Sequence, residues 1–216
     1  MFRLTHPYTY TGMETENVDR TLREVATVGR NAVWSVSTAK HGCGVEHLRD
    51  NNFETYWESD TYLQLVTDRQ PHVINIQFHR KTSITWLWFY FNFNRDGNCT
   101  PQQISIRVGT TFHDLKKVHV IELEEPCGWV KVPIGKLFDN NAEILRTHFI
   151  QVSIILMHLS PQNGTPGRDT RVRQVKIFGP RMAAWYHNAQ PTGGTNVKDY
   201  EPEYNTVEMR QFAQIR

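Results

Sequence analysis

Hydrophobic and polar residues alternate along the middle of the chain with the period of two that is typical of β-strands. In the segment 73–78, Ile74, Ile76 and Phe78 share one face, and polar side chains occupy the other face. This pattern predicts a strand that buries one face and exposes the other. The segment 104–108 alternates in the same way.

The segment 84–93 has a different pattern, because it is apolar or aromatic on both faces. Such a run predicts a central strand that is covered above and below rather than an edge strand. With an opening strand at 32–37, about eight strands are expected, which matches a two-sheet jelly-roll β-sandwich and an all-β fold class. The remaining predicted strands cover 118–123, 129–134, 149–157 and 172–178, with breaks at Pro126, Gly128, Pro133 and 161–167.

The two ends of the chain do not show this alternation. Apolar residues recur at helical spacing between residues 14 and 28, which predicts a short amphipathic helix. After Pro180 the alternation ends, and the segment 190–196 has the composition of a flexible linker. The expected organisation is therefore an N-terminal extension (1–29), a β domain (30–180) and a flexible C-terminal tail (181–216).

Charge and hydropathy narrow the class of protein. The 216 residues carry a formal net charge of +2, with acidic and basic residues interspersed, so there is no electrostatic case for binding nucleic acid or membranes. No run approaches the ~18 consecutive apolar residues that span a bilayer, and the first residues lack the apolar core of a secretion signal. We therefore expect a soluble, unsecreted protein, in which the N-x-[ST] sequons at Asn98 and Asn163 are chance matches.

Residues that could carry catalysis or bind metal are scattered. Ten histidines are present, but none forms an HxH or HExxH motif. The three cysteines lack CxxC spacing, which predicts reduced thiols rather than disulfides or a zinc site. No nucleophile elbow and no phosphate-binding glycine-rich loop is recognisable. We expect no enzymatic activity, no metal and no cofactor.

The segment 50–60, DNNFETYWESD, is the most informative stretch of the sequence. Its Asx and hydroxyl side chains can close turns on their own backbone. Trp57 is expected to be a buried anchor, whose N–H a nearby Asx oxygen can accept, in preference to a platform for a ligand. The small polar residues Asn52, Ser59 and Asp60 are candidates for exposed contacts. The pattern D-x-N-x-x-T-x-W resembles a loop of galactose-binding-like β-sandwiches, and the fuller motif resembles the Doc domain.

Further motifs support this second resemblance, which covers about residues 30–180. The chain is identified as a member of the family of Doc-domain subunits of the anaphase-promoting complex. It departs from the family pattern through extra residues at 61–69 and a longer loop at 160–167. The supporting motifs, in chain order, are Gln70-Pro71-His72, Thr100-Pro101 before 104–109, Gly128-Trp129, and Gly167-Arg168-Asp169-Thr170 before 173–177.

The resemblance implies a non-catalytic subunit of a ubiquitin ligase, present in the nucleus and cytoplasm. Loops at one end of a jelly roll would bind the destruction boxes of substrates, together with a WD40 coactivator that holds the rest of the degron. The C-terminal Ile215-Arg216 would dock on a tetratricopeptide-repeat scaffold subunit. The alternative function is a galactose-binding-like carbohydrate-binding module, because stacked aromatic rings with Asn and Asp also bind sugars.

A second candidate contact segment is the loop 163–170. Its amide, guanidinium and carboxylate groups can direct hydrogen bonds to an extended peptide, although Arg168 paired with Asp169 as a simple turn brace is an equal alternative. A cation bound in the 50–55 loop also stays open, since similar sandwiches hold calcium. The predicted degron-binding residues are Asn52, Ser59, Asp60, Asp96, Asn98, Asn163, Gly167, Arg168, Asp169 and Thr170.

Overall fold

The computed structural model describes residues 32–60, 72–135, 144–158 and 168–180, and the backbone of the short strands β1 (Tyr10–Thr11) and β2 (Leu22–Glu24). Several predictions therefore lie outside the described residues. These are the contacts of Asn163, Gly167, Ile215 and Arg216, the 61–69 insertion and the C-terminal tail.

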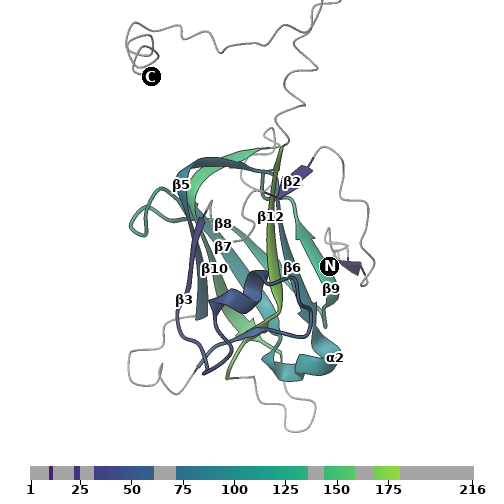
Figure 1. Ribbon diagram of the computed structural model, residues 1–216. Coiled ribbons are helices and arrows are strands. Elements are labelled where there is room, and N and C mark those ends of the chain that lie inside the picture. The colour runs from purple at the N-terminus through teal and green to yellow at the C-terminus, as the bar shows by residue number, and fades with distance from the viewer. Residues whose placement is uncertain are drawn as a thin grey trace, which may run out of the picture. The chain divides into compact units, whose positions relative to one another are not determined.

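Two five-stranded antiparallel sheets face each other (Figure 1), in the orders β1-β9-β6-β12-β2 and β3-β5-β10-β7-β8. This arrangement confirms the predicted all-β jelly-roll sandwich, and every predicted strand is present. The strands are β3 (Ala32–Val36), β5 (His72–Ile84), β6 (Trp86–Asn92), β7 (Pro101–Gly109), β8 (Lys116–Glu122), β9 (Cys127–Val132), β10 (Leu145–Met157) and β12 (Gln174–Pro180).

The core lies between the two sheets and follows the predicted alternation. Ile74 and Ile76 of β5 are fully buried, and so are Ile104 and Ile106 of β7. Each buried aliphatic side chain of this size contributes ~1.5–3 kcal/mol through the apolar surface that it removes from water. The hydrophobic pattern therefore specifies both the strands and the face that each turns inward.

Strand β6 is the central strand that its two-sided apolar pattern predicts, because it pairs with both β9 and β12. Phe89 points into the main core, while Trp88 and Tyr90 belong to a second buried aromatic cluster with Trp129. Phe53 from the 50–60 loop covers this second cluster, with its ring centroid 4.5 Å from that of Tyr90. The loop is thus packed directly onto a sheet.

The helix predicted for residues 14–28 is wrong for Leu22–Glu24, which form the edge strand β2 and pair with residues 178–180 of β12. A helix of about 15 residues is marginal without a partner, whereas the edge of β12 offers unpaired backbone groups that a strand can satisfy. The remainder of that segment lies outside the described residues. Tyr10–Thr11 adds to the opposite edge of the same sheet by pairing with β9, and the domain boundary at residue 29 stays a prediction.

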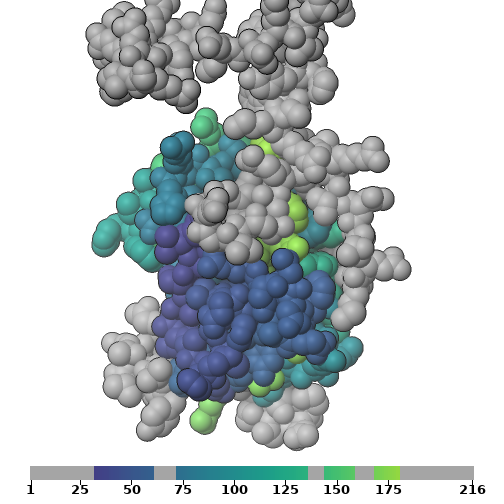
Figure 2. All heavy atoms as spheres, viewed as in Figure 1, coloured from purple at the N-terminus to yellow at the C-terminus, as the bar shows by residue number. Residues whose placement is uncertain are grey.

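Short helices and a small strand pair close one end of the sandwich, which we call the ligand end. It contains the helical turns η1 (Val45–Arg49), α2 (Phe93–Asp96) and η2 (Gly97–Cys99), and the pair of β4 (Trp57–Glu58) with β11 (Arg171–Val172). Figure 2 shows residues 32–60, in purple to blue, as a continuous surface on the side of the molecule in view.

Two further expectations can be compared with the structure. Across the part of the chain that the structure describes, no helix is long and apolar enough to cross a membrane. Cys43, Cys99 and Cys127 are free thiols, as the cysteine spacing predicts.

Candidate functional site

The 50–60 loop closes on itself through its own polar side chains. The Asp50 carboxylate accepts the Asn52 amide N–H at 2.8 Å and the Thr55 hydroxyl at 2.6 Å, and the Asn52 side chain accepts the Glu54 N–H at 3.0 Å. Asn51 has a φ of 59°, a left-handed conformation that Asn tolerates better than most residues. These bonds confirm the self-closing turns that the sequence predicts.

Gln174, the first residue of β12, holds this loop against the sandwich. The two hydrogens of its Nε2 are shared among three acceptors, which are the carbonyls of His47 at 2.8 Å and Asn52 at 2.9 Å and Asp50 Oδ1 at 2.6 Å, while its Oε1 accepts from the Asn51 N–H at 3.2 Å. Gln174 is itself buried, so its amide takes its hydrogen-bond partners from the loop instead of from water. Sequence reasoning missed this residue.

The hydrogen bonds to Asp50 bear on the cation that the sequence leaves open. Burial alone would raise the pKa of Asp50, but hydrogen bonds from Thr55, Asn52 and Gln174 outweigh it and lower that pKa. The carboxylate is thus ionised, and its oxygens already accept donors from the chain. Within the described ranges, no three His, Cys, Asp or Glu side chains gather as metal ligands.

Trp57 is the buried anchor of the loop, as predicted. Its side chain is fully buried, and its Nε1 donates to the Thr38 carbonyl at 2.8 Å. The acceptor is a backbone oxygen rather than the Asx side chain expected from the sequence, because the Asx oxygens of the loop are used in its own turns. Trp57 therefore positions the loop, and its buried ring is not accessible to a ligand.

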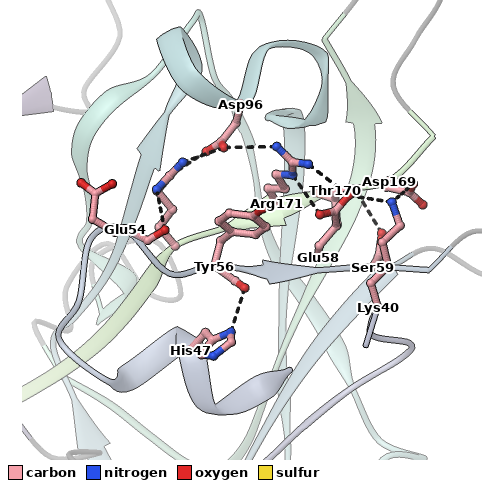
Figure 3. A network of polar contacts seen from close by, with 11 residues as sticks. Lys40, His47, Glu54, Tyr56, Glu58, Ser59, Asp96, Asp169, Thr170 and Arg171 are labelled. Carbon is pink, nitrogen blue, oxygen red and sulfur yellow. Dashed lines mark hydrogen bonds and ion pairs between the residues drawn. The ribbon is translucent and has the colours of Figure 1, made fainter. Parts of the chain in front are cut away.

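A chain of alternating charges runs through the ligand end (Figure 3), and we call it the charge chain. Its buried base is a two-pronged ion pair, in which Arg173 Nε and Nη2 each donate to an Asp96 oxygen at 2.8 Å. Arg173 Nη1 also donates to the Phe53 carbonyl at 2.7 Å. The members of the charge chain, from base to surface, are Arg173, Asp96, Arg171, Glu58, Lys40 and Asp169.

The outer part of the charge chain joins three separate segments. Arg171 contacts Glu58 through Nε at 3.1 Å and Asp96 through Nη1 at 3.8 Å. Lys40 Nζ lies 2.7 Å from both Glu58 and Asp169. Hydrogen bonds to Asp169 and Glu58 raise the pKa of Lys40, so its ammonium stays charged. With three cations and three anions, the charge chain is neutral overall.

A backbone clamp holds the 168–170 segment next to the 50–60 loop. The Ser59 N–H donates to the Thr170 carbonyl at 3.0 Å, and the Thr170 N–H donates to the Ser59 hydroxyl at 2.8 Å. His72 Nε2 lies 3.1 Å from the Arg168 carbonyl, and because a carbonyl only accepts, this nitrogen carries the proton. Burial lowers the pKa of His72, and the bond to Arg168 offsets only part of that shift.

The structure places the predicted contact residues at different depths. Asn52 and Arg168 are exposed, while Asp60, Asn98 and Asp169 are partly exposed. Ser59 was expected to be exposed, and that expectation is wrong, because its hydroxyl is fully buried in the clamp with Thr170. Whether any of these residues contacts a degron stays a prediction.

Asp96 and Asp169 are both held by cations. Asp96 is buried against Arg173, which gives it a structural role in this chain. The Asp169 carboxylate binds Lys40, so the proposed brace between Arg168 and Asp169 is not needed to hold it. Lys40, Glu58, Arg171 and Arg173 were missed in the sequence, because charged residues at strand ends are common and their partners lie far away along the chain.

Solved structures with a similar architecture include carbohydrate-binding modules. A chitosan-binding module from Paenibacillus sp. IK-5 aligns with a TM-score of 0.51 and 12% identity, over 73% of this chain and 99% of that chain. The CBM32-1 and CBM32-2 domains of Clostridium perfringens ZmpB, in complex with GalNAc, align with a TM-score of 0.53 and 10% identity, over 82% of this chain and 41% of that chain. At such identity these likenesses show the galactose-binding-like fold alone.

Sequence comparison is more specific. The family described as "Anaphase-promoting complex, subunit 10" matches residues 6–201. The Drosophila melanogaster protein named "Anaphase-promoting complex subunit 10" is 41% identical over 192 residues, which cover 89% of this chain and 85% of that protein. The Homo sapiens protein of the same name is 44% identical over 169 residues, which cover 78% and 82%. The chain therefore belongs to the anaphase-promoting complex subunit 10 family, as its Doc-domain motifs indicate.

Proposed function

We propose that this protein recognises substrates for the anaphase-promoting complex, as one half of a destruction-box co-receptor whose other half is a WD40 coactivator. In this proposal it contributes binding and no chemistry, and it acts in the nucleus and cytoplasm. Family membership supports a place in the complex. The observation that carries the recognition role is the ligand end, where polar loops are held in one arrangement by buried bonds.

Fixed loops matter because a destruction box is a short segment without a fold of its own. Ordering such a peptide costs conformational entropy, so a surface that is ordered beforehand loses less of its binding energy. In this chain, Gln174, the Ser59–Thr170 clamp and the charge chain order the loops. Asn52 and Arg168 remain exposed on the same loops, where amide and guanidinium groups can bind peptide carbonyls.

Two weak contacts on one degron explain how such a surface would raise processivity. If the coactivator holds one part of the peptide, contact with this chain becomes intramolecular, at an effective concentration on the order of mM for short connections. The residence time of the substrate then increases without a large interface, and more ubiquitin is added in each encounter.

The C-terminal residues would keep the domain beside the coactivator. In this proposal, Ile215 fills an apolar pocket of a tetratricopeptide-repeat scaffold subunit, and the Arg216 guanidinium and terminal carboxylate form directed polar bonds. Deleting Ile215 and Arg216 should weaken retention on the complex without changing the melting temperature of the domain. Unchanged co-purification with the scaffold would contradict this docking role.

A carbohydrate-binding function is the alternative that the fold suggests. Sugar sites commonly stack a ring of the sugar on an exposed aromatic side chain. Among the described Phe, Tyr and Trp residues, the exposed ring is Phe112, which lies on the turn after β7, away from the ligand end. Tyr56 lies at the ligand end, but the Arg171 guanidinium covers its ring, with Cζ 4.7 Å from the ring centroid. These observations favour a peptide over a sugar as the ligand of this end.

A reconstituted ubiquitination assay tests the proposal. Replacing Asn163, Arg168 and Asp169 with Ala should shorten substrate residence and ubiquitin chains, while the variant still assembles into the complex. The matched control replaces Gln77 and Arg146, two exposed residues of β5 and β10, with Ala. Equal processivity of the loop variant and the control, or binding of a saccharide in place of the degron, would contradict the proposal.

A further inference from the structure

Arg171 joins two parts of the ligand end that lie far apart in the sequence, the 50–60 loop and the α2–η2 segment (93–99). It is the first residue of β11, where it pairs with Glu58 of β4. Its guanidinium lies 3.1 Å from Glu58 and 3.8 Å from Asp96. In Figure 3 the side chain lies between these two carboxylates.

Each carboxylate also has a cation of its own. Glu58 binds Lys40 at 2.7 Å, and Asp96 binds Arg173 at 2.8 Å. The side chains of Glu58 and Asp96 are only 7% and 2% exposed, so a nearby cation, and not water, stabilises each charge. Because Lys40 and Arg173 remain when Arg171 is removed, neither segment loses its own ion pair. The loss is confined to one connection between the segments, because Arg173 still joins Asp96 to the Phe53 carbonyl.

We infer that Arg171 is a positioning residue, which makes the 50–60 loop and the α2–η2 segment respond to a bound peptide as one unit. Tyr56 holds the guanidinium in place, because its ring lies under Cζ at 4.7 Å and contributes a cation–π attraction. A shift of one segment therefore moves a charge that the other segment binds. The binding part of this inference rests on the proposed function.

A double-mutant cycle measures this coupling with one candidate contact residue on each segment. Asp60 lies in the 50–60 loop, and Asn98 lies in η2. The affinity of a destruction-box peptide is measured on the assembled complex with coactivator, for D60N, N98A and the double variant. If the segments are coupled, the double variant should differ from the product of the single effects by about twofold or more. In the Arg171→Met background this deviation should become smaller, because only the connection through Arg173 remains.

Three further variants and a second readout complete the test. Arg171→Lys keeps the charge but lacks a fork that reaches both carboxylates, so it should weaken the coupling as Arg171→Met does. Arg146→Met removes an exposed arginine near the start of β10, where it pairs with Ser83 of β5, and it should keep the full coupling. In the isolated full chain, D60N should shift the amide resonances of residues 93–99, and these shifts should be smaller in both Arg171 variants.

The possible outcomes separate the inference from the function on which it rests. Effects that multiply in the wild-type background, or shifts of unchanged size in both Arg171 variants, would overturn the positioning role. Peptide that fails to bind the wild-type complex would contradict the proposed function instead. In that case the resonance shifts alone decide whether Arg171 couples the two segments.

Discussion

Replacing Arg173 with Met tests whether the buried base of the charge chain holds the ligand end together. The substitution keeps an unbranched apolar side chain but removes both bonds to Asp96, whose carboxylate is 2% exposed. The Arg171 guanidinium, 3.8 Å from Asp96, is the cation that remains beside this carboxylate. The Phe53 carbonyl also loses its 2.7 Å hydrogen bond.

The expected cost follows from leaving a buried charge with a poor partner. Breaking a buried ion pair from one side destabilises a protein by about 3–5 kcal/mol. For a domain of this size, such a loss lowers the melting temperature by on the order of 10 °C. The free energy of unfolding would be measured in urea, with tryptophan fluorescence as the probe. Adding Asp96→Asn removes the stranded charge and should restore ~1–3 kcal/mol.

Arg95 supplies the matched control, because it lies on the same short helix as Asp96 and pairs with Glu54 at the surface. The two side chains of that pair are 53% and 61% exposed. Arg95→Met should therefore leave the unfolding curve unchanged, since solvent screens such pairs. If Arg173→Met is no more destabilising than Arg95→Met, or if Asp96→Asn fails to rescue it, the buried pair does not hold the ligand end.

Three more predictions concern single residues of the ligand end. Trp57→Phe leaves the Thr38 carbonyl without its donor and should lower the free energy of unfolding by about 1–3 kcal/mol, measured in urea. An unchanged urea midpoint would count against the anchor role. Gly97→Ala meets no atom within 4 Å, so its cost should be only the ~1–3 kcal/mol of backbone strain for an alanine at φ +52° and ψ −127°, measured by thermal melting; a larger loss would indicate a clash. Burial lowers the folded-state pKa of His72 below the ~6.5 of an exposed imidazole. The stability that His72 contributes is therefore complete above pH ~6.5 and is lost as the pH falls through its folded pKa, because the unfolded chain binds the proton more readily. In His72→Gln, the urea midpoint should change less with pH over this range. The same pH dependence in both proteins would contradict the assignment.

Most of the fold could be predicted from the sequence, because the hydrophobic period is set locally. Alternation in β5 and the two-sided apolar run in β6 each determine which side chains face a core. Leu22–Glu24 could not be predicted in this way, because three residues contain too little pattern to distinguish a helix from a strand. The free edge of β12, about 155 positions later in the chain, decides their conformation.

The site was less predictable, because its polar residues are buried by partners that are distant in sequence. The Thr170 N–H that holds the Ser59 hydroxyl is 111 positions away, and the Asp96 that pairs with Arg173 is 77 positions away. Composition identifies a small polar residue in a loop as a candidate contact, but its depth depends on such pairs. Trp57 was predictable because its size alone requires burial.

Exposure increases from the base of the charge chain to the surface, both among its cations and among its anions, and this gradient connects the stability of the domain with the properties of its surface. The side chains of Arg173, Arg171 and Lys40 are 4%, 26% and 41% exposed, and those of Asp96, Glu58 and Asp169 are 2%, 7% and 22% exposed. Salt screens exposed charges strongly and buried charges weakly. The buried Arg173–Asp96 pair should therefore hold the loops with little dependence on ionic strength, whereas water and ions compete for the exposed ion pairs of Lys40. A peptide that binds beside Asp169 would then contact loops that are fixed by the buried Arg173–Asp96 pair but whose surface side chains can still rearrange. Under the proposed function, such a surface would be ordered before binding and could still accept different degron sequences.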